Sequence, residues 1–143
     1  MTLLKPILAA ATMILAVAGG VRALDPLDKR MSGLSPKAAD CGNTSEVATN
    51  RAAVNACVID HFLKAQPFRA RFEMRCEDSK CATGLVLESQ PGSLYVVTYD
   101  SEGCHAEHAS DPFCGTALEW CQKPTMVPQG KGLKLLCKNE HSF

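Results

Sequence analysis

Eight cysteines constrain the fold of this 143-residue chain more than any other feature of its sequence. An even number of cysteines in a short chain is typical of a disulfide framework in an exported protein. The sequence has no C-x-x-C pair, so disulfides are favoured over a structural zinc site. We therefore predict up to four disulfides, formed in an oxidising compartment. The cysteines are Cys41, Cys57, Cys76, Cys81, Cys104, Cys114, Cys121 and Cys137.

The N-terminal residues have the layout of a secretory signal peptide. Lys5 precedes an uncharged apolar run, and small residues follow it around Ala23. The run is shorter than the roughly 20 residues that a membrane-spanning helix needs. Its order of charged, apolar and small segments is typical of a cleaved signal. We predict a signal peptide over residues 1–23 and a secreted, extracellular protein without stable membrane association.

A dibasic pair, Lys29-Arg30, follows the predicted signal peptide. Pro-segments of secreted precursors often end in such a pair, so residues 24–30 are interpreted as a pro-segment. The alternative is an ordinary solvated loop. Residues 31–143 then form a single secreted, disulfide-rich domain with one core. Basic and acidic residues are equal in number, which disfavours broad electrostatic binding to nucleic acid.

The first regular elements predicted are a helix and a strand. Residues 43–67 begin with the capping candidates Thr44 and Ser45, carry an apolar stripe at helical spacing, and end at a proline. His61 lies on that stripe, where a histidine at the edge of the core is expected rather than a metal ligand. Residues 68–75 alternate apolar and charged side chains, as a half-buried strand does.

Turns then divide the rest of the chain into further strands. Cys76 and Cys81 flank a polar turn and would face each other across a hairpin, so we predict a Cys76–Cys81 disulfide. Strands are predicted over residues 93–100 and 133–139, with a proline- and glycine-containing loop over residues 125–132. The fold class is α+β: one N-terminal helix packed on an antiparallel meander of three to five strands, stabilised by disulfides.

The charged side of the first predicted strand is a candidate binding site. Its alternating side chains would share one face of a sheet. An aromatic residue on the neighbouring strand would let this face bind an anion or stack on RNA bases. The alternative is a solvated sheet face that pairs its own charges. The candidates are Arg69, Arg71, Glu73 and Arg75, with Tyr95 or Tyr99.

The segment CHAEHASDPFC, from Cys104 to Cys114, is the second candidate. His105 and His108, with Glu107 or the following aspartate, offer ligands for zinc or copper. The alternative is a polar surface loop closed by a disulfide, because exposed polar loops are common.

Two motifs carry a family resemblance. CGNTSEVATNRAA leads into the predicted helix, and QPGSLYVVTYDSEGC places a Pro-Gly turn before an apolar strand, with cysteines near both ends. This order resembles the guanyl-specific fungal ribonucleases and their catalytically inactive relatives among small, secreted, cysteine-rich fungal effectors. The resemblance covers about residues 40–110 and implies a helix followed by a meander.

The resemblance implies catalytic positions that the chain fills only in part. Such a ribonuclease needs a general base, an arginine that offsets the developing negative charge, and a histidine acid. Glu73, or else Glu77, falls near the position of the base, and His105 or His108 falls near that of the acid. Tyr95 stands where the family has its arginine, and a neutral tyrosine carries no positive charge. The resemblance therefore implies the fold without catalysis.

These observations predict a small secreted, cysteine-rich binding protein, effector-like and without catalytic activity or a cofactor. Its expected partner is a host or competitor protein. One alternative is a ribonuclease-like enzyme or RNA-binding domain that uses Glu73 with His105 or His108. The other is a metal-binding module at His105 and His108.

Overall fold

The computed structural model describes residues 24–44, 50–88, 93–130, 132–139 and 143. The predicted signal peptide lies outside these residues. The described chain forms an α+β fold, as the sequence predicts. In chain order its elements are α1 (Pro26–Leu34), β1 (Ala39–Thr44), α2 (Arg51–Leu63), β2 (Phe68–Arg75), β3 (Lys80–Leu87), β4 (Leu94–Asp100), the 3₁₀ turns η1 (Ser101–Gly103) and η2 (Ala106–His108), β5 (Thr116–Trp120), β6 (Thr125–Gln129) and β7 (Gly132–Leu136).

Five strands form a mixed sheet in the order β1-β2-β3-β4-β5. Strands β2 to β5 run antiparallel to one another and form the predicted meander. Strand β1 instead pairs parallel with β2, and α2 makes the crossover that a parallel pair requires. The prediction of a purely antiparallel sheet is therefore wrong at this edge. Strands β6 and β7 form a separate two-stranded sheet, where the sequence predicted a loop over the whole of β6.

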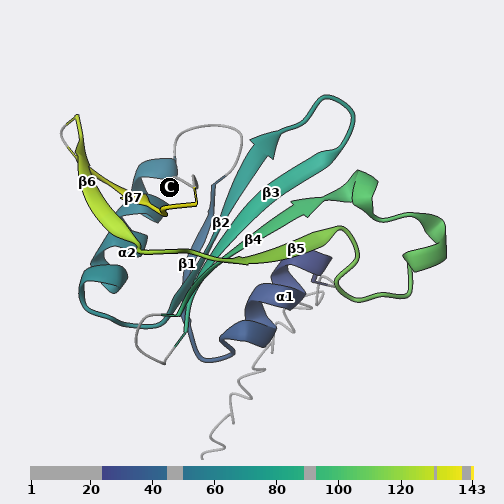
Figure 1. Ribbon diagram of the computed structural model, residues 1–143, viewed down its shortest axis with the longest axis horizontal. Helices are drawn as coiled ribbons and strands as arrows, with labels where there is room; N and C mark the ends of the chain where they lie inside the picture. Colours follow the sequence, from purple (N-terminus) through teal and green to yellow (C-terminus); the bar gives the residue numbers. More distant parts are fainter. Residues whose placement is uncertain (1–23, 45–49, 89–92, 131, 140–142) are drawn as a thin grey trace, which may run out of the picture.

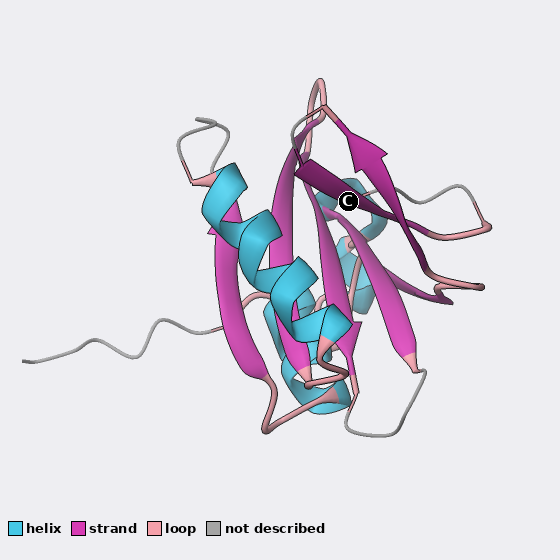
Figure 2. Cartoon of the chain, turned by 90° about the vertical axis from the view of Figure 1, so that its left-hand side faces the viewer, coloured by secondary structure: helices cyan, strands magenta, loops and turns pink. Residues whose placement is uncertain are grey.

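The mixed sheet is covered on both faces (Figure 1). Helix α1 packs on one face, and α2 with the β6–β7 hairpin packs on the other, as the view from the α2 side also shows (Figure 2). The prediction of one N-terminal helix is not confirmed, because two helices cover the sheet. The core on the α2 side contains Val54, Val58, Phe68, Ala70, Phe72, Leu85, Leu87, Leu94, Val96, Cys121, Leu135 and Cys137. The core on the α1 side contains Leu27, Met31, Ala82, Val86 and Val97.

Helix α1 is short but well specified at its start. The side chain of Asp25 accepts a hydrogen bond from the backbone N–H of Asp28 at 2.9 Å, and a proline stands at the first helical position. Both features favour a helix N-terminus. Leu27 and Met31, one turn apart, are buried against the sheet. Gly84 of β3 allows this close approach, because a Cβ atom there would collide with the Met31 side chain.

The dibasic pair lies inside α1 and not in a loop that precedes the domain. Arg30 donates from Nη1 to the Thr116 hydroxyl at 3.3 Å, and its guanidinium lies over the Phe113 ring at 5.2 Å from the ring centre. The peptide bond after Arg30 joins it to the buried Met31. Cleavage at this pair, one of the two interpretations of the sequence, would divide a helix that contributes to the core.

The predicted helix and strand are largely correct. Strand β2 spans the predicted residues, with Phe68, Ala70 and Phe72 buried, although Met74 is 51% exposed. Helix α2 buries the predicted stripe through Val54 and Val58 but begins at Arg51.

The prediction that Thr44 caps this helix is wrong. Thr44 is a buried residue of β1, and its hydroxyl accepts a hydrogen bond from the Glu73 backbone N–H at 3.0 Å. The other capping candidate, Ser45, lies outside the described residues.

All eight cysteines form disulfides, which confirms the prediction of four. The predicted Cys76–Cys81 pair closes the β2–β3 hairpin. The Cys104–Cys114 pair closes the polar loop around His105 and His108, as one of the two interpretations of that segment expected. The remaining pairs are Cys41–Cys57, which joins β1 to α2, and Cys121–Cys137, which joins the end of β5 to the end of β7.

Candidate functional site

The charged row of β2 faces the α1 side of the sheet. Its apolar residues point to the α2 side, and because side chains alternate along a strand, the charged ones point the other way. Helix α1 covers part of this face, so the row is not simply solvated. The side chain of Arg71 is only 13% exposed, whereas Arg75 at the end of the strand is exposed.

Arg71 is surrounded by three carboxylates. Its Nη1 donates to Asp25, at the start of α1, and lies 3.2 Å from a carboxylate oxygen of Asp28. Its Nε donates to Glu73 at 2.7 Å. The hydrogen bonds to Asp25 and Glu73 raise the pKa of Arg71 above its ordinary value, although burial alone would lower it. Arg71 therefore links α1 to the sheet. Its positive charge is already compensated by these three carboxylates.

The charged form of Asp28 is disfavoured in this cluster, whereas the charged form of Arg71 is favoured. Burial raises the pKa of the Asp28 carboxyl above its ordinary value, and the neighbouring charge of Asp25 raises it further. The attraction of Arg71 lowers this pKa but does not outweigh the other two effects. The short Asp28–Arg71 distance is thus no proof of a stabilising pair, because the charged form of Asp28 is disfavoured overall.

Replacing Asp28 with asparagine is expected to increase stability at neutral pH. A carboxyl whose pKa is raised in the folded state costs stability once the pH is above that pKa, and the cost disappears as the pH falls below it. The free energy of unfolding of Asp28→Asn should therefore exceed that of wild type at pH 7 and approach it near pH 4. Urea unfolding at both pH values measures this difference. A variant less stable than wild type at pH 7 would show instead that the pair with Arg71 dominates.

Glu73, the candidate general base, is held by two hydrogen-bond donors. Its Oε1 accepts hydrogen bonds from Arg71 and, at 3.2 Å, from the Asn43 side chain. The expected histidine partners lie elsewhere. His105 precedes η2 and His108 ends it, both are exposed, and His108 lies 3.8 Å from Glu107. The structure thus brings Glu73 together with Arg71 but not with either histidine.

A hollow of about 600 Å³ opens where the covered face ends. It lies between the β2–β3 hairpin, the start of α1 and Tyr99 of β4, and we call it the hairpin hollow. Arg75 and Lys80, opposite each other in the β2–β3 register, both line it. Neither side chain has a hydrogen-bond or ion-pair partner within the described ranges. The lining residues are Asp25, Arg71, Glu73, Met74, Arg75, Cys76, Ser79, Lys80, Cys81 and Tyr99.

Two of the predicted binding residues lie away from this hollow. Arg69 forms an ion pair with Asp40 of β1 at 3.2 Å and lines a smaller cavity of about 230 Å³ beside α1. Tyr95 stands at the other end of β4, opposite Trp120, which is 63% exposed. Of the two aromatic candidates, Tyr99 and not Tyr95 borders the hairpin hollow.

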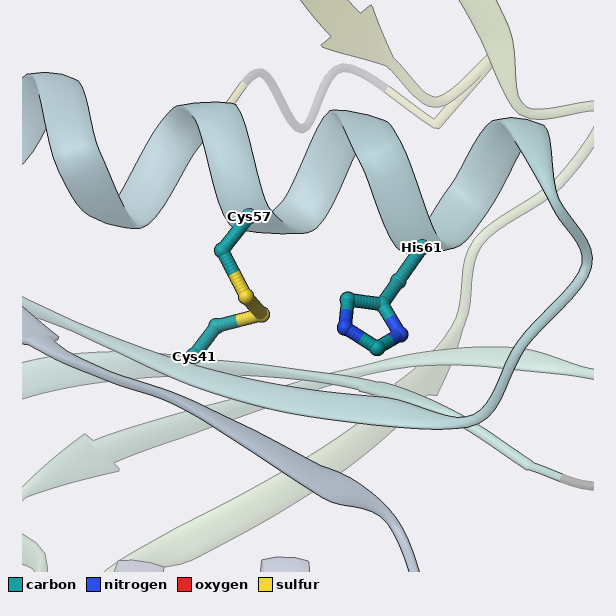
Figure 3. Close-up of side chains that lie close together, drawn as sticks. All are labelled: Cys41, Cys57 and His61. Atoms are coloured by element: carbon teal, nitrogen blue, oxygen red, sulfur yellow. A yellow bond between two sulfur atoms is a disulfide. The ribbon is translucent and has the colours of Figure 1, made fainter.

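A different set of possible ligands gathers around α2. Among the described residues, the one group of three or more metal-ligand side chains that converges is Cys41, Cys57 and His61, whose candidate atoms lie within 4.8 Å of one another. The two cysteines form a disulfide, and the His61 ring lies beside it (Figure 3). His105 and His108 are not part of such a group, so their predicted zinc or copper site has no third ligand in the described chain.

The His61 Nδ1 atom is buried and has no hydrogen-bond partner among the residues that the structure describes. An unpaired buried polar atom typically costs about 1–3 kcal/mol, so it calls for an explanation. The sequence placed His61 correctly at the edge of the core, next to Phe68, whose ring centre is 6.3 Å away. It did not indicate that Cys41, on a strand that was not predicted, would complete the group. The four-residue spacing of Cys57 and His61 was the available signal.

Comparison with known proteins adds no relative: no family model, curated protein or solved structure matches the chain. No helix in the described residues is both long and apolar enough to span a bilayer. Four disulfides are typical of a protein from an oxidising, extracellular environment.

Proposed function

We propose that this chain is a secreted, effector-like binding protein without catalytic activity, and that it recognises an acidic segment of a host or competitor protein at the hairpin hollow. One observation carries the proposal: Arg75 and Lys80 lie side by side at the hollow and are free of carboxylate partners in the described structure. Their neighbour Arg71, in contrast, is neutralised by three acids.

The chemistry of the hollow fits a carboxylate-bearing ligand. Two cations on adjacent strands can hold one carboxylate or two neighbouring ones through charge-assisted hydrogen bonds. Tyr99 and the Cys76–Cys81 disulfide offer less polar surface beside them. The hairpin is closed by that disulfide, which restrains the backbone that carries both cations and so lowers part of the entropy lost on binding.

Binding of an acidic peptide tests the proposal. A synthetic peptide rich in aspartate and glutamate is expected to bind the secreted chain, and Arg75→Ala/Lys80→Ala should weaken binding by about tenfold or more. Fluorescence anisotropy of the labelled peptide at physiological salt measures the affinity. The matched control is Arg51→Ala/Lys138→Ala, which removes the same charge from exposed positions outside the hollow. Equal losses in both variants, or no binding to wild type, would contradict the proposal.

An RNA-directed function is the second candidate, because Glu73, Arg71 and Tyr99 all border the same hollow. We expect no cleavage of RNA, since Glu73 is paired with Arg71 and Asn43 and none of the described histidines borders the hollow. Incubation with single-stranded RNA, next to Glu73→Gln and His108→Ala variants, separates the candidates. Cleavage by wild type that Glu73→Gln abolishes would replace the binding proposal with a ribonuclease-like activity.

A further inference from the structure

We infer that Cys41, Cys57 and His61 form a zinc site when the Cys41–Cys57 disulfide is reduced. The site lies on the α2 side of β1, away from the hairpin hollow, and it does not depend on the function proposed above. Three donor groups from two elements converge there. In the oxidised protein the two sulfurs are bonded to each other, so the site exists only after reduction.

The position of the three residues suits a tetrahedral metal ion. Cys57 and His61 are four residues apart on α2 and therefore lie on the same face of the helix, one turn from each other. Cys41 approaches from β1, and its Cα lies 5.5 Å from that of Cys57. Figure 3 shows the imidazole next to the sulfurs, with one ring nitrogen on their side. Two thiolates and an imidazole are a ligand set that zinc accepts, with the fourth position left to water.

The surroundings of His61 support a role beyond filling space. Figure 3 shows its Nε2 on the side of the two sulfurs, whereas Nδ1, which is buried and has no hydrogen-bond partner among the described residues, points away from them. Zinc would therefore bind Nε2, and Nδ1 would remain free to hold the ring orientation through a second partner such as water. Coordination would give this ring a strong interaction and fix its orientation. Cys41, Cys57 and His61 are each only partly buried, so a small thiol and a metal ion can reach them.

The chemistry balances with a low-molecular-weight thiol as the reductant. One thiolate attacks a sulfur of the Cys41–Cys57 bond, forming a mixed disulfide and releasing the other cysteine. A second thiol molecule attacks the mixed disulfide and leaves as the oxidised dimer, so the protein gains two electrons and two protons. Zinc then displaces both thiol protons into solvent, while neutral His61 supplies a lone pair. The metal ion would replace the disulfide as the link between β1 and α2.

Cobalt(II) is a suitable probe because its thiolate complexes absorb light. The full secreted chain, reduced with a phosphine that has no thiol of its own, is expected to bind one equivalent of Co²⁺ with a sulfur-to-metal charge-transfer band, and zinc should displace it. His61→Ala should weaken binding by at least about tenfold. Cys41→Ser/Cys57→Ser should abolish the band. His108→Ala, which alters an exposed histidine outside the group, should match wild type, and the oxidised chain should show no band.

If reduction unfolds the chain, circular dichroism gives a second measure of zinc binding, namely recovery of the folded state. Zinc should then restore the native spectrum of reduced wild type but not of reduced His61→Ala, because an ion that binds only the folded state stabilises it. The inference is overturned if reduced wild type shows neither the band nor recovery. It is also overturned if His61→Ala or the double serine variant binds as wild type does, since the other six thiols would then account for the metal.

Discussion

Replacing Leu27 with alanine should lower the free energy of unfolding by about 3 kcal/mol. Leu27 is completely buried in the core between α1 and the sheet, and leucine-to-alanine changes at such positions typically cost about 2–5 kcal/mol. The core on this side is the smaller of the two, so the lost contacts are not easily replaced. Urea unfolding of the secreted material, followed by circular dichroism, measures the change.

The control for this substitution is Leu24→Ala. Leu24 is 52% exposed and precedes α1, so its loss should change the free energy of unfolding by less than about 0.5 kcal/mol.

The comparison of Leu27→Ala with Leu24→Ala also tests whether the chain is cut at the dibasic pair. If the chain is cut after Arg30 during export, Leu27 is absent from the secreted protein, and neither substitution would have an effect. Mass spectrometry of the secreted wild type gives its N-terminus directly, and we expect a chain that retains α1.

Local patterns were sufficient to predict the elements that lie in the middle of the sheet. Strand β2 has an alternation without a break, and its inward residues form the core against α2. The Cys76–Cys81 pair could be predicted because a short hairpin brings its two ends together. The Cys104–Cys114 pair was one of two interpretations of its segment. The Cys41–Cys57 and Cys121–Cys137 pairs each join residues 16 positions apart, and no local pattern selects one such partner over another.

The sequence did not predict α1, β1 or β6, because the burial of these elements depends on contacts with residues far away in the sequence. Helix α1 has only two fully buried apolar side chains, Leu27 and Met31, among charged and small residues, and it packs well because Gly84 lies beneath it. Strand β1 is an edge strand of mostly polar residues, so it lacks the alternation that identifies a strand. Strand β6 contains Pro128, which is tolerated because β6 pairs only with β7.

The sequence predicted which face of β2 carries its charged residues, but it did not predict which of these charges are paired, nor that Lys80 lies beside Arg75. The alternation of β2 correctly placed Arg69, Arg71, Glu73 and Arg75 on one face. Two of the three acids around Arg71 come from the start of α1, and Asp25 is 46 residues away in the sequence. Helix α1, which the sequence did not predict, thus provides acids that pair with Arg71. Within the described residues, Arg75 has no such partner and can bind a ligand.

Replacing Arg71 with methionine should lower the free energy of unfolding by about 2–3 kcal/mol at pH 7. Methionine keeps the apolar stem but removes the guanidinium, which leaves Asp25, Asp28 and Glu73 converging without a cation. Breaking a buried ion pair by removing one partner typically costs about 3–5 kcal/mol. The three carboxylates are between 24% and 35% exposed, and water reduces their repulsion, so we expect the lower end of this range or less.

Acid should reduce this loss. Burial and the neighbouring charge of Asp25 already raise the pKa of Asp28, and without Arg71 the attraction that lowers this pKa is lost, so it rises further. Groups raised in this way cost stability above their folded pKa values, and the folded state recovers that stability as the pH falls through them. The difference between Arg71→Met and wild type should therefore shrink from pH 7 to pH 4 in urea unfolding. Arg75→Met, which removes an exposed arginine without an ion-pair partner in the described chain, should change stability little at either pH.

The double variant Arg71→Met/Asp28→Asn separates repulsion between the acids from a simple loss of packing. If three uncompensated carboxylates cause the loss, removing the charge of Asp28 should recover part of it, and the recovery should exceed the effect of Asp28→Asn in the wild-type background. Additive effects would mean that Arg71 acts mainly through its apolar contacts. Non-additive effects would show that Arg71 holds α1 on the sheet by neutralising the acids at its start, which is the same arrangement that leaves Arg75 and Lys80 as the free cations of the hairpin hollow.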